Sequence, residues 1–71
     1  MNTIHIGHEI QAVFKDKGWS ISLFAEKLHF DRTNIYRIFK RKSIDTDLLF
    51  EISKVLNYNF FTLYSPQNRD K

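Results

Sequence analysis

The chain has 71 residues, one proline, two glycines and no cysteine, with a formal net charge of +3. This length predicts one domain with one core, and without cysteine neither a disulfide nor a thiolate metal site can reinforce it. The scarcity of glycine and proline favours helices over a sheet rich in turns. No apolar run approaches the ~20 residues of a membrane span and no signal peptide opens the chain, so we expect a cytoplasmic protein.

The first half of the chain predicts two helices. Apolar residues at the spacing of one helix face are Ile6, Ile10, Val13 and Phe14, and Gly18 is placed to end this first helix. Ser20 can cap a second helix. The buried side of that helix would hold Phe24, Ala25 and Leu28.

A tight turn and a third helix follow. We expect His29 to adopt a positive φ in the turn, since two helices joined this closely usually need such a residue. Asp31 is a suitable N-cap for the third helix, and its charge suits the positive end of the helix dipole. The inner face of the third helix would hold Ile35, Ile38 and Phe39.

Two further helices complete an all-α bundle of five short helices. Asp45 is placed to cap the fourth helix and Asn57 to end it in the left-handed region. Asn59 would cap a short last helix that contains several aromatic residues. We therefore predict a single domain over residues 1–66, ending near Pro66, and a polar tail over residues 67–71.

The positive charge is concentrated in residues 31–42. This segment holds five basic residues against a single acid, whereas residues 1–30 have no net charge. The basic residues are Arg32, Arg37, Lys40, Arg41 and Lys42. A polyanion is the partner that such clustering favours, and a helix with a basic outer face suits the major groove of DNA. A solvated helix face without a partner is the alternative.

Residues 21–40 thus predict a helix-turn-helix, and the chain resembles the phage lambda repressor and Cro-like (Xre) family over residues 6–64. The residues that carry this resemblance form an ordered set: Gly18, Ser20, Ala25, Leu28, Phe30, Ile35 and Ile38, then the runs 45–56 and 57–63. Ala25 lies where the two helices would cross, and a larger side chain there would force them apart. The resemblance implies sequence-specific binding of double-stranded DNA by a prokaryotic or phage transcriptional regulator, with residues 31–40 as the recognition helix.

Three departures from the family pattern have physical consequences. Ile21 stands where the family usually has a glutamine that contacts a phosphate, and His29 replaces the glycine of the turn. Phe14 and Phe39 occupy the positions of an arginine–glutamate pair found in many members. Replacing both partners of a buried ion pair by packed apolar groups is often neutral or stabilising, so we predict that Phe14 and Phe39 touch.

The resemblance also implies which side chains contact DNA. Those expected at base edges are Arg32, Thr33, Tyr36 and Arg37. Those expected at phosphates are Ser20, Asn34, Lys40, Arg41 and Lys42. Each arginine is suited to bidentate contact with guanine O6 and N7, whereas phosphate contacts supply affinity without sequence information.

Other sequence signals are weak. His5 and His8 are spaced for one helix face, but two imidazoles without further ligands make a poor metal site. No serine lies in a motif that would activate it as a nucleophile. We therefore expect neither a metal, nor a cofactor, nor an enzymatic activity.

The aromatic C-terminal segment leaves two interpretations open. Tyr58, Phe60, Phe61 and Tyr64 are too many aromatic residues for one short helix to bury completely. Either the last helix wraps over the core, or the region of Phe60, Phe61 and Tyr64 joins two copies into a homodimer, which would suit two half-sites on DNA. The alternative function is a protein-interaction module, such as an antitoxin-like regulator, that uses this helix to bind a partner.

Overall fold

The computed structural model describes residues 4–64, and Pro66 and the predicted tail lie outside them. The elements are α1 (Ile6–Asp16), α2 (Ile21–Leu28), α3 (Arg32–Lys40), α4 (Thr46–Leu56) and η1 (Phe60–Tyr64). The all-α prediction of five short helices is confirmed, with a 3-10 helix as the last of them. No helix in the described part of the chain is long and apolar enough to cross a membrane.

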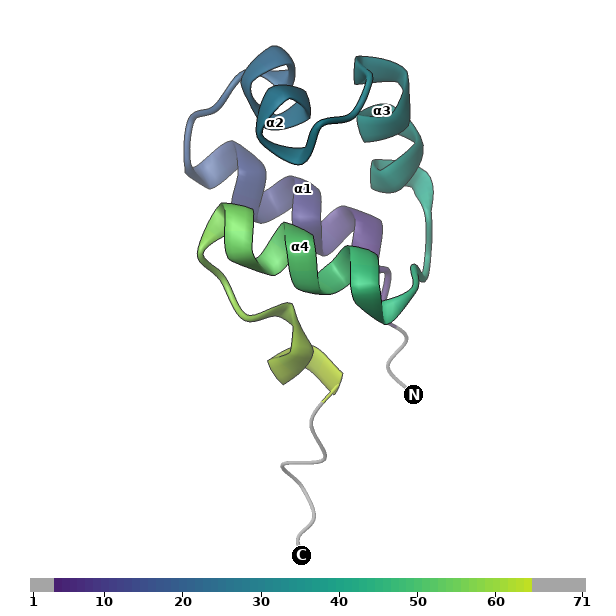
Figure 1. The fold of residues 1–71 in the computed structure, drawn as a ribbon. Helices are drawn as coiled ribbons and strands as arrows, with labels where there is room; N and C mark the ends of the chain where they lie inside the picture. Colours follow the sequence, from purple (N-terminus) through teal and green to yellow (C-terminus); the bar gives the residue numbers. More distant parts are fainter. Residues whose placement is uncertain (1–3, 65–71) are drawn as a thin grey trace, which may run out of the picture.

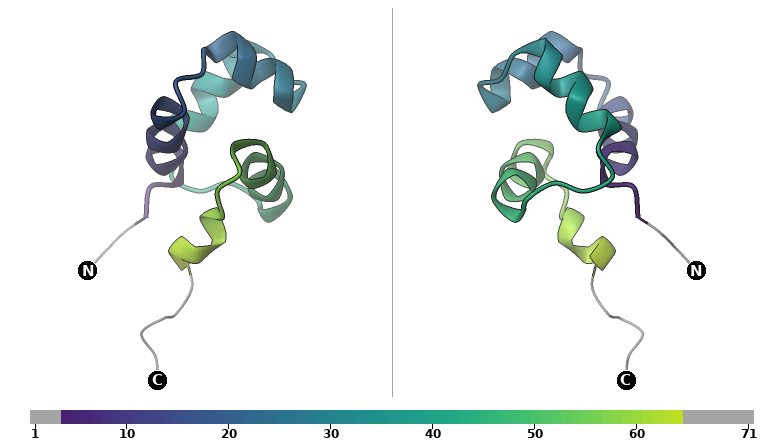
Figure 2. Two further views of the ribbon diagram at one scale, coloured as in Figure 1. Left: turned by 90° about the vertical axis from the view of Figure 1, so that its left-hand side faces the viewer. Right: turned by 90° about the vertical axis from the view of Figure 1, so that its right-hand side faces the viewer.

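The helices form two groups around a shared core. α2 and α3 lie together at one end, while α1 and α4 run in the same direction beneath them (Figure 1). Views from the two sides show α1 and α4 end-on, with α2 and α3 arching over both (Figure 2). η1 lies beyond α4, on the side away from the predicted helix-turn-helix.

Local capping signals set most helix boundaries. The Ser20 hydroxyl oxygen accepts a hydrogen bond from the Leu23 N–H (3.1 Å), and the Asp45 carboxylate accepts one from the Leu48 N–H (2.7 Å). The Asn59 side chain accepts from the Phe61 N–H at 3.1 Å. Three of the four predicted N-caps are therefore confirmed.

The predicted helix endings are confirmed as well. Gly18, His29 and Asn57 have φ values of 74°, 60° and 54°. After α2, the Phe30 N–H donates to the Ala25 carbonyl at 2.9 Å, and this bond closes a Schellman-type ending. His29 thus supplies the residue with left-handed backbone conformation that ends α2.

Two N-caps differ from expectation. Asp31 occupies the N-cap position of α3, but its side chain makes no capping hydrogen bond. No capping role was predicted for His5, yet it caps α1, since its Nδ1 accepts a hydrogen bond from the His8 N–H (3.2 Å). The two imidazoles stack with ring centroids 3.6 Å apart.

Three phenylalanines lock α1, α2 and α3 together. The ring centroid of Phe14 is 5.2 Å from that of Phe24 and 5.4 Å from that of Phe39. All three side chains are buried, and the predicted contact between Phe14 and Phe39 is confirmed. Apolar packing therefore joins the first helix to α3.

We predict that Phe39→Ala lowers the free energy of unfolding by about 3–5 kcal/mol, because it leaves a cavity among three packed rings. Chemical denaturation followed by circular dichroism measures this loss. The double variant with Phe14→Ala should lose less than the sum of the two single losses, because the residues share one contact.

Phe50→Ala is the matched control for this experiment. Phe50 is 54% exposed on α4, so the same truncation there should cost less than about 1 kcal/mol. Equal losses for Phe39→Ala and Phe50→Ala would contradict the packing role of Phe39.

Candidate nucleic-acid interface

α3 presents one polar, basic face to solvent and one apolar face to the core. Ile35, Ile38 and Phe39 are buried. The exposed residues of the helix are Arg32, Thr33, Asn34, Tyr36, Arg37 and Lys40. Every base-contact candidate predicted from the sequence is therefore accessible, and all of them lie on one continuous outer surface.

Helical spacing divides this outer surface. Thr33, Arg37 and Lys40 follow one another at i, i+4 and i+7 along its middle, opposite the buried stripe. Asn34 and Arg41 lie toward α4, where they share a shallow groove with Arg37. Base-contact and phosphate-contact candidates are thus brought side by side, although Asn34 lies at the edge of the surface and not at its centre.

The positive charge of this surface is not neutralised by the protein. Within residues 4–64 the one ion pair joins Lys54 to Glu51 on α4, at 3.8 Å. The five basic residues of segment 31–42 form none there. Their charge is therefore available to an external anion.

The start of α2 contributes less than the family pattern implies. Ile21 is half-buried and packs against the core, so it replaces a polar phosphate contact by apolar packing. Ser20 is exposed, and its hydroxyl oxygen accepts the capping hydrogen bond. The hydroxyl hydrogen remains to donate to a phosphate, so Ser20 can combine both roles.

Main-chain contacts with α1 hold the C-terminal end of α3. The Gly7 N–H donates to the Arg41 carbonyl at 2.9 Å, and the Ile6 N–H donates to the Lys42 carbonyl at 3.0 Å. A methyl group on Gly7 would collide with the carbonyl oxygens of Ile38 and Phe39. We call these two hydrogen bonds, together with the close approach of Gly7 to the end of α3, the α1–α3 joint.

The α1–α3 joint places the basic loop that follows α3. Arg41 and Lys42, both predicted phosphate contacts, supply the two carbonyl groups that α1 binds. Two N–H groups at the start of α1, which would otherwise lack partners, are satisfied in the same way. The main chain beneath these two side chains is therefore anchored, while the side chains themselves are exposed.

The residues described do not gather a metal site. Among residues 4–64, no group of three or more histidine, aspartate or glutamate side chains lies close enough to hold an ion. The Nδ1 atom of His5 is already engaged in capping α1.

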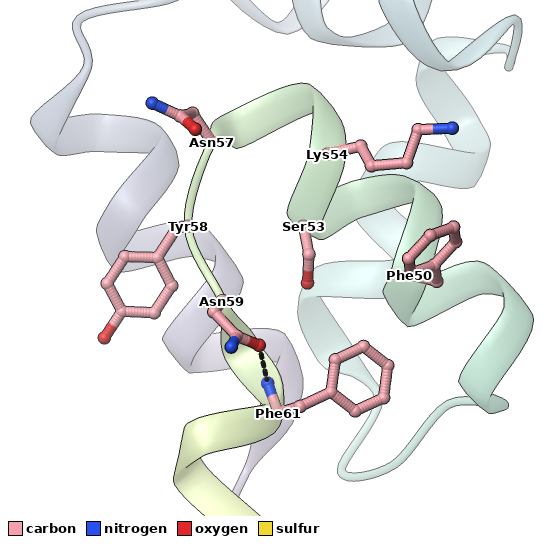
Figure 3. A pocket seen from close by; sticks show the side chains of 7 residues that line it. All are labelled: Phe50, Ser53, Lys54, Asn57, Tyr58, Asn59 and Phe61. Carbon is pink, nitrogen blue, oxygen red and sulfur yellow. Dashed lines mark hydrogen bonds between the residues drawn. The ribbon is translucent and has the colours of Figure 1, made fainter.

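A second, aromatic surface lies at the opposite end of the molecule. Phe50 and Phe61 line an open hollow between α4 and η1, and Tyr58 lies on the other side of it, toward α1 (Figure 3). Tyr64 is 49% exposed, whereas Phe60 is completely buried. The prediction that Phe60 belongs to a dimer surface is therefore wrong, because its side chain fills the core beneath η1.

Two features of this interface are not indicated by the amino-acid sequence. Gly7 gave no signal, since nothing local distinguishes a glycine in the first turn of a helix from any other small residue. The other is the Asp31 side chain, which makes no capping hydrogen bond, although aspartate before a helix predicts one.

Comparison with known proteins adds one finding. The family model described as "Helix-turn-helix" matches residues 10–63, which include all of α2, α3 and α4. The searches of curated proteins and of solved structures each gave no significant match.

We predict that Gly7→Ala destabilises the protein by about 1–3 kcal/mol, as expected for an overpacked contact. This loss would occur although alanine is the better helix former by about 1 kcal/mol. Denaturant unfolding measures it, and amide hydrogen exchange should show faster exchange at Ile6 and Gly7 because their acceptors move away.

Gly18→Ala is the control. Its new methyl group would meet nothing within 4 Å, so only its φ of 74° opposes the change. It should leave the exchange of the Ile6 and Gly7 amides unaltered relative to global stability. A Gly7→Ala variant as stable as wild type would refute the close approach.

Proposed function

Because this chain belongs to the helix-turn-helix family of the lambda repressor and Cro (Xre) type, we propose that it binds double-stranded DNA sequence-specifically as a transcriptional regulator of a prokaryotic cell or phage. It would act in the cytoplasm, by occupying an operator. α3 enters the major groove, as recognition helices of this motif do.

The observation that carries this proposal is the unpaired basic surface of α3. Its positive side chains form no ion pair within residues 4–64, and they surround the exposed polar residues of the helix. Arg32 and Arg37 are proposed to contact guanine edges, Thr33 another base edge, and Tyr36 a thymine methyl group or a phosphate. Lys40, Arg41 and Lys42 would grip the phosphates beside the groove, with Ser20 and Asn34 as further phosphate contacts.

In this arrangement, electrostatic contacts to phosphates and hydrogen bonds to bases make different contributions to binding. Each phosphate neutralised releases counterions, so log K should fall by about 0.9 per contact for each tenfold rise in salt. Each good bidentate arginine–guanine contact discriminates by roughly 1–3 kcal/mol. The basic loop therefore supplies affinity, and the first turns of α3 supply the choice of sequence.

We predict that the double variant Arg32→Ala/Arg37→Ala loses at least about 30-fold in affinity for the preferred duplex, from the loss of two base contacts. The preferred duplex is first selected from a randomised pool at ~0.15 M salt, a condition that suppresses weak electrostatic binding. Fluorescence anisotropy titrations over a range of salt concentrations then give affinity and salt dependence.

Lys15→Ala/Lys54→Ala is the matched control, since it removes two exposed positive charges from outside α3. It should retain the selected sequence and nearly all of the affinity. Wild-type binding that is insensitive to salt, or equal losses in the two double variants, would contradict the proposed interface.

A second candidate function, protein–protein contact, is favoured by the aromatic surface. Phe50 and Tyr58 are 54% and 42% exposed around the hollow between α4 and η1. Exposed aromatic clusters on small domains often mark interaction surfaces. A second copy of the chain is the partner to test first, because two-fold dimers match operators with two half-sites.

For this candidate we predict that Tyr64→Glu raises the dimer dissociation constant at least about tenfold, since a charge would be buried in the contact. Analytical ultracentrifugation measures the change. Tyr36→Glu, which alters an equally exposed tyrosine on α3, should leave the dimer intact. A wild type that stays monomeric at millimolar concentration would eliminate the homodimer.

A further inference from the structure

The side chain of Asp31 is unused by the protein, although it stands at the leading end of α3. It is exposed, makes no capping hydrogen bond and forms no ion pair within residues 4–64. It is also the single acidic residue in the basic segment 31–42. A negative charge here weakens the attraction of the basic segment for DNA phosphates, so the presence of Asp31 calls for an explanation.

Comparison with Asp45 shows that the main chain does not prevent capping by Asp31. The two residues have nearly the same backbone, with φ −73° and ψ 155° for Asp31 against φ −72° and ψ 162° for Asp45. Asp45 nevertheless caps its helix through its carboxylate, at 2.7 Å from the Leu48 nitrogen. Backbone conformation is therefore not the cause of the difference.

The equivalent donor at the start of α3 has another acceptor. The Asn34 N–H, which corresponds to the Leu48 N–H of α4, donates to the main-chain carbonyl of Asp31 at 3.0 Å. This bond leaves the Asp31 carboxylate with both oxygens available to a group outside the protein.

We propose that Asp31 is a specificity-determining residue whose carboxylate accepts a hydrogen bond from the exocyclic amino group of a cytosine in the major groove. This inference rests on the proposed function, because it requires α3 to lie in that groove. Asp31 directly precedes Arg32 and Thr33, so the cytosine would lie beside the bases that these residues contact.

The chemistry of the carboxylate selects the base. An ionised carboxylate only accepts hydrogen bonds, and cytosine presents the N4 amino donor in the major groove. Guanine presents two acceptors there and thymine presents O4, so both would repel the negative charge. Adenine offers a donor next to the N7 acceptor and is a poorer match for two carboxylate oxygens.

The negative charge also sharpens selection against other DNA. Close to phosphates it lowers affinity for every duplex, and only a site that supplies the amino donor compensates for this loss. Discrimination built partly on repulsion is a common route to specificity.

Asp31→Asn tests the proposal, because asparagine is an equally good N-cap but carries an amide in place of the charge. Binding is selected from a randomised duplex pool at ~0.15 M salt for wild type and variant, and affinities are measured on duplexes that differ at single base pairs. Wild type should prefer cytosine over the other bases at one position by about 5- to 100-fold.

The variant should lose this preference or change it to adenine, which asparagine binds through N6 and N7. Its affinity for unrelated duplexes should rise several-fold, since a negative charge near the phosphates is gone. Asp45→Asn is the matched control at the other aspartate N-cap, and it should leave preference at every base pair unchanged.

Three results would overturn the inference. Unchanged base preference in Asp31→Asn would do so while leaving the proposed function intact, provided that Arg32→Ala/Arg37→Ala still abolishes selection. A wild type that selects no sequence would overturn both. Equal shifts in melting temperature for Asp31→Asn and Asp45→Asn, with no change in base preference, would assign Asp31 a structural role alone.

Discussion

The direct contact of two main chains, in which the first turn of α1 meets the last turn of α3, is the constraint on which the rest of the structure depends. It requires Gly7, because any side chain would separate the two helices. Further along α1, Phe14 packs on Phe39, so α3 is braced at two points by the same helix. The turn that follows α2 holds the other end of α3. The orientation of the outer face of α3 is thus determined from both ends.

The elements that the sequence predicted well were those with local causes. Ser20 and Asp45 cap helices through neighbours three residues away, and the positive φ of His29 follows from the shortness of the turn. The contact between Phe14 and Phe39 could be predicted because apolar residues occupy both positions of the ion pair expected from the family resemblance. Exposure of the base-contact candidates followed from helical periodicity, which requires no knowledge of the tertiary structure.

What could not be predicted depends on which surfaces meet. The requirement for glycine at position 7 arises only when α3 is placed against α1. Burial of Phe60 depends on how η1 turns beneath α4, and a short 3-10 helix has no clear periodicity to indicate it. The free carboxylate of Asp31 depends on competition between two acceptors for one N–H, and residue preferences do not resolve such a competition.

The α1–α3 joint also couples the first turn of α1 to the basic loop that follows α3. Its two sides come from residues far apart in the chain, so it can form only when α1 and the end of α3 have come together. An anion held by Arg41 and Lys42 would favour the conformation in which their carbonyls are bound by Ile6 and Gly7. By thermodynamic linkage, ordering of the first turn of α1 then strengthens binding by the same factor. The first turn of α1 can therefore change how tightly Arg41 and Lys42 hold an anion.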